Sequence, residues 1–299
     1  MKKFLICFSA IIFLLAISDK VFAQVIEDSS NQNVEQNSEE FLGLKLRPEI
    51  RAIVKEIEQK SGRGIYSKFI ELDKFMLGSS YISEDGLPVV LVDYDLEGKP
   101  KKLEAVITHE LLHLRLRVNG YPTFLFSESV NMSKGRAIDT EQDHINEVLS
   151  LIEHQIFKAD MEKFDLHKYI NLAGDTAAGA RKNKGKEDGQ ADSINYARAI
   201  LEYPNTKDIE EVRKIYTANK WTRALRDGEA IAGFIKTSNI RTPKDVDAVF
   251  LKCLSQLFPL PSSSYNFKLT LDPNKKVGRR MIISISRQTT VKERKSKRN

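Results

Sequence analysis

Cysteine and tryptophan are scarce in this chain, with two Cys and one Trp among 299 residues. So few cysteines exclude a disulfide-dense scaffold, while 15 Gly and 9 Pro are too few for a collagen-like or low-complexity chain. The apolar fraction of 41% is ordinary for a globular protein, and the length is sufficient for a sizeable hydrophobic core. The fold must therefore be stabilised by packing or by a metal ion rather than by disulfides.

Long hydrophobic runs are also missing. The apolar run Phe4–Ile17 is shorter than the roughly 20 residues that a membrane-spanning helix needs. It follows Lys2 and Lys3 and precedes Val21-Phe22-Ala23, a small-residue pattern typical of a cleavage site. We therefore expect residues 1–23 to be a signal peptide and the mature chain to be exported, secreted or periplasmic, with no transmembrane segment. Cys253 would then be the only cysteine and a buried structural thiol.

Excess positive charge is absent from the body of the chain. The formal charge of +6 divides into +2 on residues 1–23, +5 on residues 287–299 and −1 on the residues between. A nucleic-acid-binding surface needs cationic density in the folded part, so we expect no nucleic-acid partner. Residues 287–299 are interpreted as a basic disordered tail.

The patterns of the remaining chain predict an α+β fold. Helical spacing occurs at 48–61, 102–118 and 139–164, and strands are expected within 64–77 and over 87–94, with a loop at 121–136. The polar residues 24–40 indicate a disordered leader and residues 171–193 a flexible loop. Residues 194–286 are expected to be mostly helical and to end in a β-hairpin.

The strongest chemical signal is His109-Glu110-Leu111-Leu112-His113, which lies inside the helix predicted over 102–118. Residues four apart share a helix face, so both imidazoles can bind one metal ion. Nitrogen ligands with an open coordination position suit zinc, which lowers the pKa of a bound water. Glu110 lies beside that position and is predicted to be the catalytic general base.

This pentad, with a strand before it and a helix after it, resembles the zincin-type zinc metallopeptidases. The metzincin extension is absent because Leu116 and Asn119 occupy its Gly and His positions. A peptide deformylase would need a cysteine ligand upstream, which the mature chain lacks. The resemblance is therefore to gluzincins and to uncharacterised secreted bacterial proteins with the same pentad, in which a second helix supplies an acidic ligand.

The third ligand remains open among three residues of the following helix. Glu153 lies at the shoulder of its apolar stripe, and its context resembles the acidic residue of those uncharacterised proteins. Glu147 lies on the polar face, and the sequence around it resembles the Asn-Glu-x-x-Ser segment of thermolysin-like enzymes, with Leu151 departing from that pattern. His154 is the third possibility.

The resemblance implies a zincin-like catalytic core over residues 41–170 and one zinc ion per chain. It also implies a peptide or protein substrate that pairs with an exposed edge strand, expected at Leu87–Tyr94. The alternative is an exported, non-catalytic binding protein on a zincin-like scaffold. Substrate specificity and oligomeric state have no signal in the sequence.

Overall fold

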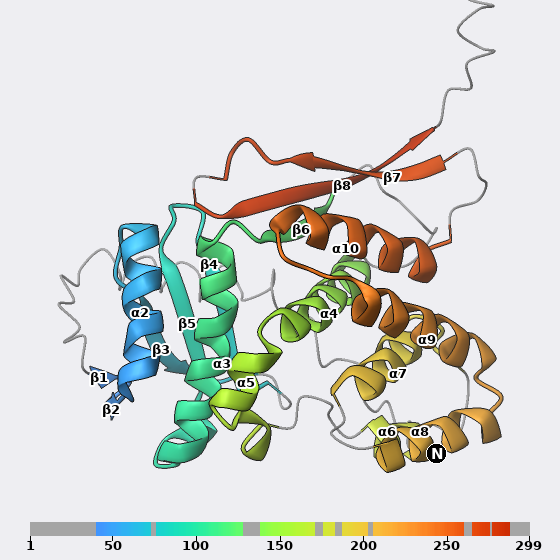
Figure 1. Cartoon of the computed structure of the whole chain (residues 1–299), viewed down its shortest axis with the longest axis horizontal. Helices are drawn as coiled ribbons and strands as arrows, with labels where there is room; N and C mark the ends of the chain where they lie inside the picture. The colour runs from blue at the N-terminus through green and yellow to red at the C-terminus, as the bar shows by residue number, and fades with distance from the viewer. Residues whose placement is uncertain are drawn as a thin grey trace, which may run out of the picture.

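The computed structural model describes residues 40–72, 76–127, 138–170, 176–182, 187–202, 206–259, 265–275 and 277–287. This part of the chain has an α+β fold with small mixed sheets, as predicted (Figure 1). The signal peptide, the leader before Glu40 and the tail after Arg287 were predicted for segments that lie outside the described residues. None of the described helices combines the length and the apolar character needed to cross a bilayer.

The first half of the fold is built on a three-stranded sheet with the order β3-β5-β4. Its strands are β3 (Tyr66–Ile70), β4 (Gly78–Ile82) and β5 (Pro88–Asp93). β5 pairs parallel with β3 and antiparallel with β4, so the expectation that Leu87–Tyr94 is an edge strand is wrong. The run Val89–Val92 is apolar on both faces and fully buried, which suits a central strand. The edge strand nearest the pentad helix is β4.

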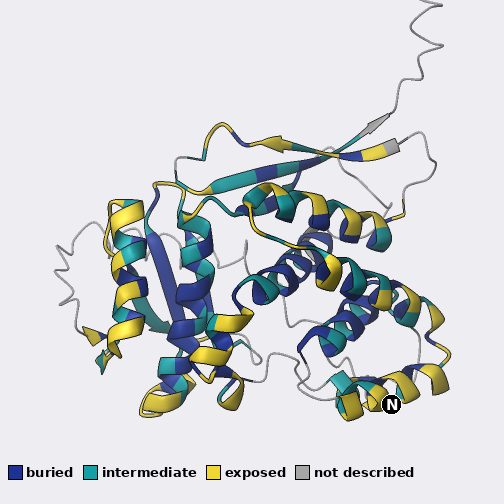
Figure 2. Ribbon diagram, in the orientation of Figure 1, coloured by how far each residue is buried: buried dark blue, intermediate teal, exposed yellow. Residues whose placement is uncertain are grey.

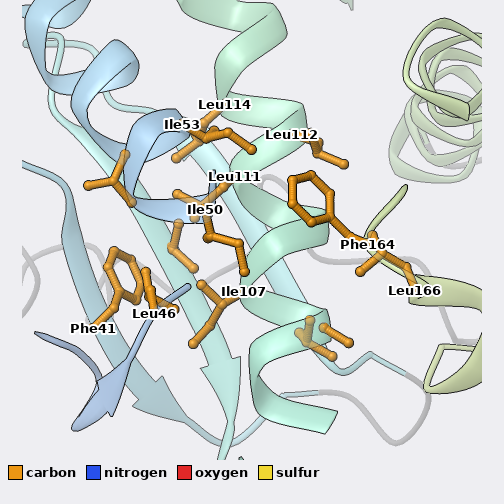
Figure 3. Packing of buried hydrophobic residues seen from close by; sticks show 14 of the residues in the cluster. Phe41, Leu46, Ile50, Ile53, Ile107, Leu111, Leu112, Leu114, Phe164 and Leu166 are labelled. Carbon is orange, nitrogen blue, oxygen red and sulfur yellow. The ribbon is translucent and has the colours of Figure 1, made fainter. Parts of the chain in front are cut away.

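Two helices complete this first core. They are α2 (Pro48–Ser61) and α3 (Pro100–Val118), and both begin with a proline at a first-turn position. A small antiparallel pair, β1 (Glu40–Phe41) and β2 (Leu44–Lys45), lies at the start of the described chain. Figure 3 shows side chains of α2 and α3 meeting in one apolar cluster with Phe41, Leu46, Phe164 and Leu166. The helices predicted at 48–61 and 102–118 are confirmed.

The helix predicted over 139–164 is divided into α4 (Ile138–Ile156) and α5 (Lys158–Lys163). Phe157 separates them with non-helical backbone angles and is 1% exposed. Its ring lies 5.0 Å from that of His113 and belongs to the first core, whereas the apolar stripe of α4 belongs to a second core. The chain bends here because the two segments pack into different cores.

The second core joins α4 to the carboxyl-terminal part of the chain. Its helices and strands, together with those packed on it, are β6 (Pro122–Phe126), α6 (Thr176–Lys182), α7 (Ala191–Glu202), α8 (Thr206–Ala218), α9 (Thr222–Thr237), α10 (Pro243–Leu257), β7 (Tyr265–Leu271) and β8 (Arg279–Arg287). The buried residues line the facing sides of these helices (Figure 2). Cys253 is among them, and burial raises the pKa of its thiol to about 12, which confirms a structural role.

The terminal hairpin of β7 and β8 is confirmed, but it is part of a larger sheet. β6 pairs parallel with β8, giving the order β6-β8-β7. β6 lies in the predicted loop 121–136, and α6 lies in the predicted loop 171–193, so both loop predictions are wrong in part. Both elements are short and depend on partners distant in sequence, β8 for β6 and α8 for α6.

β4 and α3 approach closely at Gly78. A Cβ atom at this position would lie 2.7 Å from Cγ1 of Val106 and 2.9 Å from Cγ of Glu110. Both separations are shorter than a carbon–carbon contact, so only glycine lets the strand pack this tightly against the helix that carries the pentad.

We predict that Gly78→Ala destabilises the protein by about 1–3 kcal/mol, because the added methyl group overpacks this contact. Gly179→Ala is the matched control, since Gly179 lies within α6 with open space around it and alanine favours a helix. Thermal and urea unfolding would measure both variants. If Gly78→Ala were as stable as the wild type, the close contact between β4 and α3 at this position would be contradicted.

Candidate metal centre

The pentad helix α3 presents its two histidines on one face. His109 and His113 are one turn apart, and their ring centroids lie 4.7 Å from each other. Their side chains are 12% and 13% exposed, so both rings are mostly covered but reach the surface of a cleft. The helical placement predicted from the sequence is confirmed.

α4 brings a third imidazole to this pair. His154 is buried, and its Nε2 atom lies 3.0 Å from Nε2 of His109. One nitrogen from each of His109, His113 and His154 lies within 4.8 Å of the others, so this group could hold a metal ion. No other group of three or more metal-binding side chains is found among the described residues.

Hydrogen bonds fix which ring nitrogen faces the centre. Nδ1 of His113 lies 2.7 Å from Oε2 of Glu153, and Nδ1 of His154 lies 2.7 Å from Oε1 of Glu202. Nδ1 of His109 contacts Oε1 of Glu110 at 3.1 Å. An ionised carboxylate can only accept, so these contacts favour a proton on each Nδ1 and a lone pair on each Nε2. Nε2 of His154 also lies 3.2 Å from Oγ of Ser150.

This arrangement fits a cation. Two lone pairs that face each other at 3.0 Å, as in His109 and His154, repel unless a positive centre lies between them. Two imidazole nitrogens on a tetrahedral zinc ion are about 3.3 Å apart, given bond lengths of about 2.0–2.1 Å. Burial lowers the pKa of His154 to about 4, with Glu202 opposing the effect, so the ring is neutral and can coordinate near pH 7.

Each of two histidines is supported by a carboxylate that is itself paired with an arginine. We call each set of histidine, carboxylate and arginine a supporting arm. In the first arm, Arg117 forms a bidentate ion pair with Glu153, with Nη2 2.9 Å from Oε2, and Glu153 accepts a hydrogen bond from His113. Burial raises the pKa of Glu153, but Arg117 and His113 outweigh burial and hold the pKa below its ordinary value. The carboxylate stays ionised and orients the ring.

The second arm comes from the carboxyl-terminal half. Glu202 at the end of α7 accepts from His154, and its side chain is 1% exposed. Nε of Arg198, one turn earlier on α7, lies 3.9 Å from the second oxygen of Glu202. The helical region therefore contributes directly to the metal centre.

The geometry favours His154 over the two carboxylates as the third ligand. Glu153 lies beside the centre, but both of its oxygens bind Arg117 and one also binds His113. Glu147 is buried elsewhere on α4, where the charges that act on it are those of Arg198, Asp143 and Asp188. Neither belongs to the group of side chains that could share an ion.

Glu110 lies between β4 and the histidines of α3. Its Oε2 accepts from Oγ of Ser80 at 2.8 Å, so β4 holds the carboxylate next to the histidines. Burial raises the pKa of Glu110, but His109, His113 and Ser80 outweigh burial, and the net pKa lies below its ordinary value. The carboxylate is therefore ionised and can take a proton.

A cleft of about 470 Å³ opens onto this group. Its lining comes from β4, from β6 with part of α4, and from the connection between β7 and β8. The pentad residues His109, Glu110 and His113 also line it.

Glu202, Arg117 and Arg198 were not predicted from the sequence as site residues. His154 was the third candidate ligand, after the carboxylates of Glu153 and Glu147. The i,i+4 spacing of His113 with Arg117 and of Arg198 with Glu202 was visible, but not the meeting of α3, α4 and α7. No protein family model, curated protein or solved structure matches this chain.

We predict that Glu202→Gln weakens zinc binding roughly 10- to 100-fold, because it removes the charge that orients His154. Glu147→Gln is the matched control, since it changes an equally buried glutamate in the same way and should leave the affinity unchanged. Competition with a chromophoric chelator measures both. Equal losses of zinc affinity in the two variants would contradict a specific role of Glu202 in orienting His154.

Glu147 gives a prediction on pH and stability. Burial raises its pKa to about 7, with Arg198 opposing and Asp143 and Asp188 adding to the effect. Since the folded-state pKa is the higher one, this group contributes stability at low pH that is lost as the pH rises through about 7.

Glu147→Gln should therefore unfold at a higher temperature than the wild type at pH 8 and at a similar temperature near pH 4.5. Thermal unfolding followed by circular dichroism measures this, with the exposed Glu229→Gln as control. A lower unfolding temperature of Glu147→Gln at pH 8 would show that the electrostatic attraction to Arg198 dominates instead.

Proposed function

We propose that this chain is a zinc-dependent peptide hydrolase with a zincin-like core, exported by its amino-terminal signal segment. The observation that carries the proposal is the convergence of three imidazoles beside an ionised, buried carboxylate, at a place where His109, Glu110 and His113 line a cleft. The proposed ligands are His109, His113 and His154. Three nitrogen ligands leave one coordination position open, as catalytic zinc sites require.

The chain's own residues supply the proton chemistry. Zinc, when bound, provides Lewis-acid activation of water and of a carbonyl group. Glu110 takes the proton of the attacking water and later gives it to the leaving amine. Ser80 holds Glu110 in place, and the two arms keep the histidine rings oriented. The lowered pKa of Glu110 means that the carboxylate is ionised at neutral pH, so its oxygens carry no proton before the step.

The walls of the cleft support an extended peptide as substrate. On β6, the side-chain amide of Gln142 binds the carbonyl of Phe124 and the N–H of Phe126, and Arg117 donates to the carbonyl of Pro122. These bonds occupy the backbone groups that another strand would use. β4 pairs on one side with β5 in the described sheet, and its other edge faces the cleft. A peptide can add to β4 and pass in front of Glu110.

Glu110→Gln should retain one zinc per chain and lose at least 100-fold in peptide hydrolysis, because the amide cannot accept the proton. His154→Ala should lose zinc, whereas His167→Ala, which changes an exposed histidine, should keep zinc and activity. Elemental analysis and a peptide-library assay of the purified protein measure these effects. A wild type without stoichiometric zinc, or Glu110→Gln with full activity, would overturn the proposal.

A further inference from the structure

The connection between β7 and β8 reaches across to the first sheet and closes one end of the cleft. We call Lys275, Val277 and Gly278 the strap. Nζ of Lys275 donates to the carbonyl oxygens of Ile82 at 2.8 Å and Ser83 at 2.9 Å, and its side chain is only 7% exposed. A lysine ammonium is rarely buried, and here these two bonds hold it at the end of β4 together with Glu84, whose Oε1 lies 3.9 Å from Nζ.

Other contacts hold the strap against the same end of the sheet. A Cβ atom on Gly86, in the β4–β5 turn, would lie 2.6 Å from Cγ2 of Val277, so the Val277 side chain packs directly on the backbone of this turn. Arg280 binds Glu84 of that turn and also lies 3.3 Å from Asp272. The strap therefore forms a fixed wall.

The alternation of the backbone shows which edge Lys275 occupies. The carbonyl of Leu77 accepts from Asp93, and the N–H of Ser83 donates to Leu87, so these odd-numbered positions point toward β5. Successive residues of a strand point their backbone groups to opposite sides. The backbone groups of Gly78, Ser80 and Ile82 thus point into the cleft, and Lys275 takes the position of an N–H from an added strand at Ile82.

The blocked position is close to the reacting group. Ser80 is level with Glu110 because its Oγ lies 2.8 Å from Oε2. Ile82 is two residues further along β4, which is about 6.6 Å at the rise of a strand. A peptide paired with Gly78 and Ser80 consequently meets the strap within about two residues of the bond that faces Glu110.

We propose that the strap makes this protein an end-cutting peptidase, which hydrolyses bonds within about two residues of one terminus of an oligopeptide. This inference rests on the proposed peptide hydrolysis and adds its substrate class. The terminus is the one that faces Lys275. A residue whose role is only to fasten the hairpin would leave the cleavage pattern unchanged when it is replaced.

The test uses the zinc-loaded full chain and nested synthetic peptides around one cleavage site. The peptides extend by zero to six residues at either end, and mass spectrometry locates each cut. The cleavage rate of the wild type should fall at least tenfold once the peptide extends more than two residues from the cleaved bond toward Lys275. Extension in the other direction should leave the rate unchanged. Lys275→Met should recover at least tenfold on the long peptides.

Lys268→Met is the matched control, because it removes an exposed cation from β7 of the same hairpin, and Lys268 does not line the cleft. It should keep the wild-type pattern. Zinc content and thermal unfolding establish that each variant is folded, and Lys275→Gln replaces Lys275→Met should the latter fail to fold.

Equal wild-type rates on peptides with four or more residues on both sides of the bond would overturn the inference. So would a folded Lys275 variant with an unchanged cleavage pattern. A zinc-loaded wild type that cuts no peptide in the series or in a random library would overturn the proposed hydrolase itself, which is a distinguishable result.

Discussion

The structure depends on the pairing of buried carboxylates between helices that are far apart in the sequence. Glu153 lies between Arg117 and His113, and Glu202 lies between Arg198 and His154. A buried charge without a partner costs several kcal/mol, so these contacts restrict how α3, α4 and α7 can pack. The same contacts orient the three imidazole rings, each of which offers one nitrogen within 4.8 Å of the others, so packing and coordination geometry share one set of bonds.

The part of the site that could be predicted from sequence is the part held by one helix. His109, Glu110 and His113 follow from helical spacing, and the structure places them together as expected. The third donor could not be predicted because it depends on how α4 rotates against α3. Glu153 and His154 are neighbours in sequence and differ by about 100° around the helix, so a small rotation exchanges ligand and supporting residue.

The fold shows the same division. Helices α2 and α3 lie close to the ranges that apolar periodicity predicts, and residues 194–286 are mostly helical and end in a hairpin, as expected, in the part that the structure describes. β6 was not predicted because Gly120 before it and Pro122 at its start are typical of a loop. Its strand character comes from pairing with β8, which is distant in sequence. The edge position was assigned to β5 instead of β4 because adjacency to the pentad helix in sequence does not determine strand order.

The three histidines also come from helices that pack into different hydrophobic cores. His109 and His113 belong to a helix of the first core, and His154 belongs to a helix whose apolar stripe lies in the second. An ion shared by these rings would act as a crosslink between two halves that are otherwise joined by side-chain packing and by ion pairs such as Arg117 with Glu153.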